Sequence, residues 1–108
     1  MADKSIADQI KEILALKEDE EGYSVNISPR TAQIALTRIP ALQAIIKKER
    51  DLQIGDPEIS HTNENSITLY WHVDGKYDVL AHVKPDGRTD YYADFFDDKP
   101  IKGKFSFT

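Results

Sequence analysis

Cysteine is absent from this chain of 108 residues, and methionine and tryptophan each occur once. Without a thiol the chain has no disulfide, no thiolate nucleophile and no zinc site built on cysteine. No apolar run approaches the roughly 18–20 residues that a membrane-spanning helix needs. The opening MADKSIADQI lacks a long apolar stretch and a small-residue cleavage site, so the sequence predicts no signal peptide. We therefore expect a cytoplasmic protein without a membrane partner.

Positive charge is also scarce, since 14 lysines and arginines stand against 19 aspartates and glutamates. The net charge of −5 disfavours binding to nucleic acid, because phosphate backbones attract basic surfaces. The five glycines are scattered singly, so none belongs to a phosphate-cradling loop. With 40% hydrophobic and 31% charged residues, the composition is that of a folded domain. We expect one domain over residues 1–108, with a helical part over 4–50 and a sheet part over 57–108.

Helical spacing of apolar residues marks the first half of the chain. The first stripe consists of Ile6, Ile10, Ile13 and Leu14, and the second of Ala32, Ala35, Ile39, Leu42 and Ile46. Ser5 or Asp3 suits the N-cap of the first helix, while Ser28 and Pro29 suit the N-cap and first position of the second. Pro40 interrupts the second stripe. Because proline removes a helical hydrogen bond, we expect a kink there or two short helices.

After the sequence Gly-Asp-Pro at 55–57 the apolar period changes from helical to alternating, which is typical of strands. The expected strands cover 57–60, 67–73, 77–83 and 91–95, with a last one that contains Phe105 and Phe107. The loop KPDGR places Gly87 where positive φ is needed, so we expect a three-residue loop that pairs Ala81 with Tyr91.

The loop VDGK has two solutions. A two-residue turn would place Trp71 opposite Asp78, whereas a three-residue loop over 73–75 places Trp71 opposite Tyr77. A one-residue slip turns a whole strand over, so burial of Trp71 favours the second solution. The sequence thus predicts an α+β fold in which two N-terminal helices, the second kinked at Pro40, pack on one face of a four- or five-stranded antiparallel meander.

This register places two of the three histidines on the outer face of the sheet. His82 lies opposite Asp90, and such a pair can hold an imidazole in one tautomer, as an acid–base site requires. Opposite charges across a sheet also occur for stability alone, and no serine or threonine is spaced to be a nucleophile here. His72 and His82 lie several residues apart with no ligand motif, so we expect neither a metal site nor a cofactor.

Larger side chains are also expected on the same face, where this register places Thr68, Leu80 and Tyr92 in one row and His72 opposite Lys76. Tyr70, Leu80 and Tyr92 are expected to expose aromatic and aliphatic area, with His72, His82 and Asp90 among the polar residues around them. An apolar centre inside a charged rim is how protein interfaces are commonly composed. The predicted binding residues are therefore Tyr70, His72, Leu80, His82, Asp90 and Tyr92.

Phe95 and Phe96 point to opposite sides of a strand. One of them therefore lies outside the core, unless the C-terminal segment or a second copy of the chain covers it.

Several stretches resemble a family of small bacterial proteins without known activity. They are EGYSVNIS from Glu21, DPEI from Asp56, SITLYW from Ser66 and DGRTDYYA from Asp86. Tyr70 stands where that family usually has an acid, and Glu21 where it often has tryptophan. The resemblance covers the chain from about Leu16 onward. It implies the same α+β fold but no activity and no catalytic residue.

The leading hypothesis is a non-catalytic protein-binding or accessory module, such as an antitoxin-like or inhibitory partner, that uses the outer sheet face. One alternative is a small enzyme that uses His82 and Asp90. Another is a homodimer that assembles through this face or through the edge strand with Phe105 and Phe107.

Overall fold

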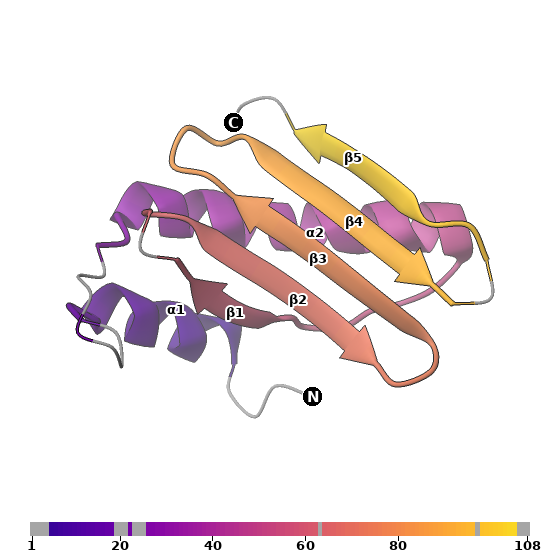
Figure 1. The fold of residues 1–108 in the computed structure, drawn as a ribbon, viewed down its shortest axis with the longest axis horizontal. Helices are drawn as coiled ribbons and strands as arrows, with labels where there is room; N and C mark the ends of the chain where they lie inside the picture. The colour runs from indigo at the N-terminus through magenta and orange to yellow at the C-terminus, as the bar shows by residue number, and fades with distance from the viewer. Residues whose placement is uncertain (1–4, 19–21, 23–25, 63, 97, 106–108) are drawn as a thin grey trace.

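The computed structural model describes residues 5–18, 22, 26–62, 64–96 and 98–105. Two helices precede five strands that form one antiparallel sheet in the order β1-β2-β3-β4-β5 (Figure 1). The elements are α1 (Ile6–Ala15), α2 (Pro29–Arg50), β1 (Glu58–His61), β2 (Ile67–Val73), β3 (Tyr77–Val83), β4 (Thr89–Phe95) and β5 (Ile101–Phe105). This confirms the predicted α+β fold. None of the described helices is long and apolar enough to cross a membrane.

Both helices begin where the sequence indicates. Ser5 is the N-cap of α1, and the alternative cap Asp3 lies outside the described residues. In α2 the Ser28 hydroxyl accepts a hydrogen bond from the Thr31 amide at 3.2 Å. The Asn65 side chain, just before β2, accepts from the Ser28 amide at 2.8 Å and from the Thr31 hydroxyl at 3.1 Å. The start of α2 is thereby joined to the start of β2.

Helix α2 is one unbroken helix from Pro29 to Arg50, so of the two alternatives expected at Pro40, a kink or two short helices, the second is wrong. Figure 1 shows it running behind the sheet along its full length. Pro40 removes one backbone hydrogen bond and costs about 3 kcal/mol in a helix interior. Ala35, Leu42 and Ile46 are fully buried. Burial of a large aliphatic side chain stabilises by about 1.5–3 kcal/mol, so this stripe outweighs the cost of the proline.

The β3–β4 loop follows the sequence prediction. Gly87 has φ of 93°, its amide donates to the Lys84 carbonyl at 3.0 Å, and the Lys84 amide donates to the Arg88 carbonyl at 2.9 Å. Ala81 lies opposite Tyr91, as expected. The glycine closes this hairpin because it adopts the positive φ without a steric penalty.

The β2–β3 register differs from the prediction by two residues. The Lys76 amide donates to the Val73 carbonyl at 3.0 Å, so the loop spans 74–76 and Trp71 pairs with Val79 instead of Tyr77. The prediction placed Gly75 last in the loop, as Gly87 is, but here it occupies the middle position with φ of 71°. A shift of two keeps every side chain on its face, so Trp71 remains buried.

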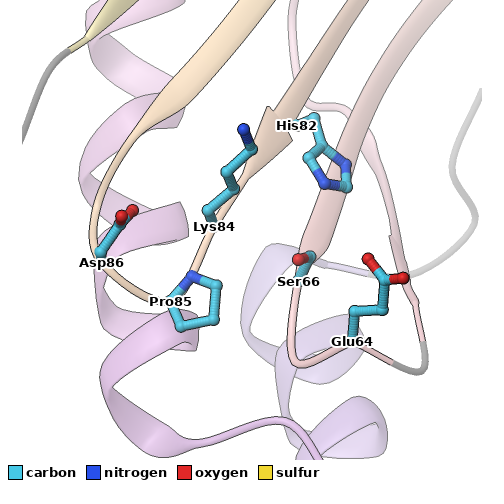
Figure 2. A pocket seen from close by; sticks show the side chains of 6 residues that line it. All are labelled: Glu64, Ser66, His82, Lys84, Pro85 and Asp86. Atoms are coloured by element: carbon cyan, nitrogen blue, oxygen red, sulfur yellow. The ribbon is translucent and has the colours of Figure 1, made fainter.

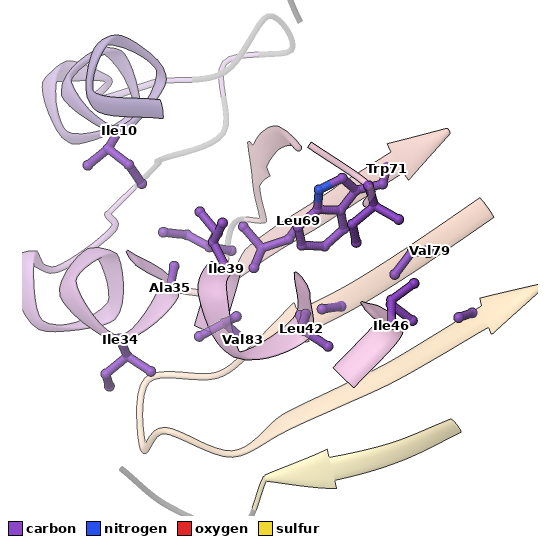
Figure 3. Packing of buried hydrophobic residues seen from close by; sticks show 14 of the residues in the cluster. Ile10, Ile34, Ala35, Ile39, Leu42, Ile46, Leu69, Trp71, Val79 and Val83 are labelled. Atoms are coloured by element: carbon purple, nitrogen blue, oxygen red, sulfur yellow. The ribbon is translucent and has the colours of Figure 1, made fainter. Parts of the chain in front are cut away.

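The core lies between α2 and the inner face of the sheet (Figure 3). Trp71 packs there and its indole N–H donates to the Gly55 carbonyl at 2.7 Å, which ties the connection after α2 to β2. At the end of β4, Phe95 is buried while Phe96 is 52% exposed. One of the two phenylalanines is therefore outside the core, as expected. Of the predicted last strand, Phe105 ends β5 and Phe107 lies outside the described residues.

Candidate functional site

The outer face of the sheet, which faces the viewer in Figure 1, carries the predicted binding residues. One row across all five strands consists of Glu58, Tyr70, Leu80, Tyr92 and Lys102. The expected row had Thr68 beside Leu80, and the two-residue shift replaces it with Tyr70. The three larger side chains therefore adjoin one another. Leu80 is 46% and Tyr92 45% exposed. We call Tyr70, Leu80 and Tyr92 the outer patch.

His72 stands beside the outer patch and is held by two carboxylates. The corrected register places it opposite Asp78 rather than Lys76, and its Nδ1 contacts the Asp78 carboxylate. Its Nε2 lies 2.5 Å from the Asp74 carboxylate. The Tyr70 hydroxyl donates to Asp78 at 2.9 Å, and the Tyr70 and His72 rings stack with centroids 5.8 Å apart. These four side chains form a connected network.

The network shifts the pKa values of three of its members. The hydrogen bond to Asp78, then that to Asp74, raises the pKa of His72 above its usual value of 6.5. The hydrogen bond from His72, then that from Tyr70, lowers the pKa of Asp78. Hydrogen bonding to Asp78 also raises the pKa of the Tyr70 hydroxyl, which therefore keeps its proton. A general base needs an imidazole nitrogen free for the substrate, whereas both nitrogens of His72 are engaged by carboxylates.

His82 and Asp90 are opposite each other, as predicted. Among the residues that the structure describes, however, no hydrogen bond or ion pair joins them. Asp90 instead lies 3.7 Å from the Lys84 ammonium group. The competing lysine on the same face therefore takes the carboxylate that the sequence assigns to His82.

His82 lines an open hollow of about 310 Å³ (Figure 2). Its other lining residues are Glu64, Ser66, Lys84, Pro85 and Asp86, from the segment before β2 and from the β3–β4 loop. They include carboxylates as well as a cation, so the hollow does not present one sign of charge. In the described part of the chain, no group of three or more His, Asp or Glu side chains could hold a metal ion.

Asp74 and Asp78 are not among the predicted binding residues, and their contacts with His72 were not predicted, although Asp78 was expected on this face. The signal was present, since Asp78 lies opposite His72 once the loop closes at Val73. The two loop closures compatible with a buried Trp71 differ by two residues and expose the same faces, so burial alone did not separate them.

No protein-family model matches the chain, and neither a curated protein nor a solved structure does. The resemblance to small bacterial proteins stays a prediction, and part of its Gly-Tyr motif lies outside the described residues. Any functional assignment therefore depends on the geometry of the outer face.

Proposed function

We propose that the protein is a non-catalytic binding module that holds a partner protein against the outer patch. The observation that carries this proposal is the in-register row of Tyr70, Leu80 and Tyr92 on a face that no described helix covers. Leu80 and Tyr92 are each almost half exposed, at the centre of a charged rim. Apolar centres of this kind with a polar rim are the usual anchors of protein interfaces. A cytoplasmic location fits the absence of cysteine.

The charges beside the outer patch support a partner with a basic side chain. Asp94 lies directly opposite Asp78, whose carboxylate is already bonded to His72 and Tyr70. Like charges opposite each other destabilise a sheet, and Asp94 has no bonding partner within the described residues. A cation brought by the partner would relieve this repulsion. We therefore expect a protein segment that presents an apolar side chain for Leu80 and Tyr92 with a lysine or arginine beside it.

An enzymatic role for His82 and Asp90 has less support. Asp90 is engaged by Lys84, and the histidine that does have aspartate partners, His72, offers no free ring nitrogen. The Tyr70 hydroxyl next to it keeps its proton because its pKa is raised. A binding role needs none of these groups to transfer a proton.

The proposal is tested with a double variant, Leu80→Ser with Tyr92→Ser, used to capture partners from a lysate of the source cells. Tyr70 is left intact because its hydroxyl is bonded to Asp78. The matched control is Leu80→Met with Tyr92→Phe, which keeps the apolar area. A protein captured by the wild type and by the control, and lost by the serine variant, supports the proposal. Equal capture by all three variants would show that the outer patch is not the site.

The charge argument has its own variant, Asp94→Lys. This substitution should weaken binding of the captured partner while leaving the fold intact, because Asp94 faces outward. The partner's affinity would be measured by calorimetry with both purified proteins. Unchanged affinity would remove the basic side chain from the description of the partner.

A further inference from the structure

Strand β5 ends the sheet, and its far edge has no described strand or helix beside it (Figure 1). An edge strand of this kind presents backbone N–H and C=O groups that another extended chain can pair with. Strand addition to such an edge is a recurring mode of peptide recognition, in which main-chain hydrogen bonds supply affinity and alternate side chains supply specificity.

Three contacts from neighbouring elements hold β5 in place. The Arg50 guanidinium of α2 donates to the Lys99 carbonyl at 2.6 Å, just before the strand. The Arg38 guanidinium lies 4.5 Å from the centre of the Phe105 ring, at its other end. On the inner face the Tyr91 ring passes over Gly103, so close that an added Cβ would lie 2.5 Å from its hydroxyl. Strand β5 is therefore held in its extended conformation before a partner binds, which lowers the entropic cost of pairing.

The outer face of β5 is basic. Lys102 and Lys104 are exposed, and neither forms an ion pair with another described residue. Lys104 lies opposite Asp90, but that carboxylate is nearest to Lys84. Since alternate residues of a strand point the same way, a chain added beside β5 would place every second side chain next to these lysines. Carboxylates at those positions would be attracted.

The inner face of β5 is apolar, since Ile101 and Phe105 are only partly buried against the core. The residues of an added strand that alternate with its carboxylates would extend this apolar surface. The edge therefore selects an extended segment in which acidic and apolar residues alternate.

The same lysines disfavour pairing with a second copy. In an antiparallel β5–β5 contact centred on Gly103, Lys102 of one copy would lie opposite Lys104 of the other. The two neighbouring registers that preserve the faces place either Lys102 opposite Lys102 or Lys104 opposite Lys104. Like charges directly opposite destabilise a strand pair, so the charges act against self-association and in favour of an acidic partner.

We propose that the free edge of β5 binds, by strand addition, an extended segment of another protein in which acidic and apolar residues alternate. This site adjoins the outer patch, since Lys102 lies opposite Tyr92, but it uses the backbone edge of β5 instead of Leu80 and Tyr92, so its failure would leave the proposed function standing.

The first test measures binding of a short synthetic peptide that alternates glutamate with valine, by fluorescence anisotropy and by backbone NMR. The peptide should bind the wild-type protein and shift the amide signals of residues 101–105 more than those of β1. A peptide that alternates lysine with valine should bind at least about tenfold more weakly. Absence of binding by the glutamate peptide would overturn the proposal.

The second test reverses the charges on the protein. Lys102→Glu with Lys104→Glu should lose the glutamate peptide and gain the lysine peptide. The matched control is Lys11→Glu with Lys76→Glu, which changes the net charge equally at exposed positions away from β5. If the control loses the glutamate peptide as fully, the attraction is that of the whole molecule and the proposal fails.

The third test separates strand addition from simple charge attraction. Two glutamate peptides are N-methylated at every second residue, in opposite phases. Only one side of a strand donates its N–H groups to the edge, so one phase should lose binding and the other should keep it. Equal binding of both phases would contradict strand addition.

Sedimentation of Lys104→Glu tests the charge argument, because this single change places glutamate opposite lysine and should allow dimers that the wild type does not form.

Discussion

The two edges of the sheet are finished in different ways. At the β1 edge, helix α1 packs alongside and the Gln9 side chain acts as a short substitute strand: its Oε1 accepts from the Ile59 amide at 2.8 Å and its Nε2 donates to the Pro57 carbonyl at 3.2 Å. At the β5 edge, Lys102 and Lys104 are exposed and no described element follows. The β1 edge is thus covered by side-chain hydrogen bonds, whereas the β5 edge carries only the positive charge of its lysines. Closing an edge forbids every partner, whereas charge forbids only partners of the same sign.

The largest effect is expected when the anchor of the β5 edge is removed. Arg38 is almost fully buried, donates to the Thr89 hydroxyl at 3.1 Å and to the Gly87 carbonyl at 2.9 Å, and covers Phe105. Arg38→Met keeps the aliphatic stem but removes these donors. We expect the free energy of unfolding to fall by about 3 kcal/mol, measured by urea denaturation. Arg30→Met, an exposed position of the same helix, should change it by less than about 0.5 kcal/mol.

Gly103 tests how closely β5 packs against the Tyr91 ring of β4. A Cβ at this position would lie 2.7 Å from Cζ of Tyr91, so Gly103→Ala forces the ring away from its place beside Phe105. We expect a loss of about 1–3 kcal/mol in the free energy of unfolding. In a Tyr91→Leu background the same substitution should cost much less, because no ring occupies the space. Equal costs in both backgrounds would show that the aromatic cover of Gly103 does not matter.

At the opposite edge, Gln9→Leu should lower the free energy of unfolding by about 1–2 kcal/mol, because two backbone groups lose their side-chain partner. Gln9→Glu keeps the acceptor for Ile59 but loses the donor to Pro57, so its effect should be intermediate. Hydrogen exchange should accelerate at the Ile59 amide and stay unchanged in β5. Exchange that rises at both edges alike would mean that α1 stabilises the whole sheet rather than its first strand.

The layers and faces of this fold could be predicted because they depend on local patterns. The stripe that ends at Ile46, the cap at Ser28 and the alternation around Trp71 each determine which side chains are buried, and the structure agrees. The β2–β3 register could not, because loops of 73–75 and 74–76 bury the same residues. The two loops differ in where Gly75 lies within them. The hydrogen bond from the Lys76 amide to the Val73 carbonyl shows that the loop is 74–76.

The candidate site was predicted in part for the same reason. The residues of the outer patch were correctly placed on one face, but their adjacency followed only from the register. The His82–Asp90 pair shows a second limit: opposition across strands brings two groups near, while a competitor such as Lys84 decides which bond forms. The connection of Asp74 to His72 depends on the loop conformation, which the residue pattern did not specify.

The His72 network lies on the outer face between the two edges, and changes to it should have the smallest effect on stability. It concerns His72 and Asp78, whose pKa values shift in opposite directions. The raised pKa of His72 means that the contribution of this residue to stability is fully present below pH 6.5 and is lost as the pH rises through the higher folded value. The lowered pKa of Asp78 works in the opposite sense: its contribution is present above about pH 3.8 and is lost as the pH falls through the lower folded value. The network therefore contributes most between these limits.

An NMR titration of the His72 imidazole should give a midpoint above 6.5, since its protonated form is held by two carboxylates. Asp78→Asn should lower this midpoint more than Asp74→Asn does, because the hydrogen bond to Asp78 is the larger cause of the shift. Asp74 is almost fully exposed, so water can replace it at little cost. A larger effect at Asp74 would mean that the β2–β3 loop, and not the pairing of β2 with β3, holds the His72 side chain in place.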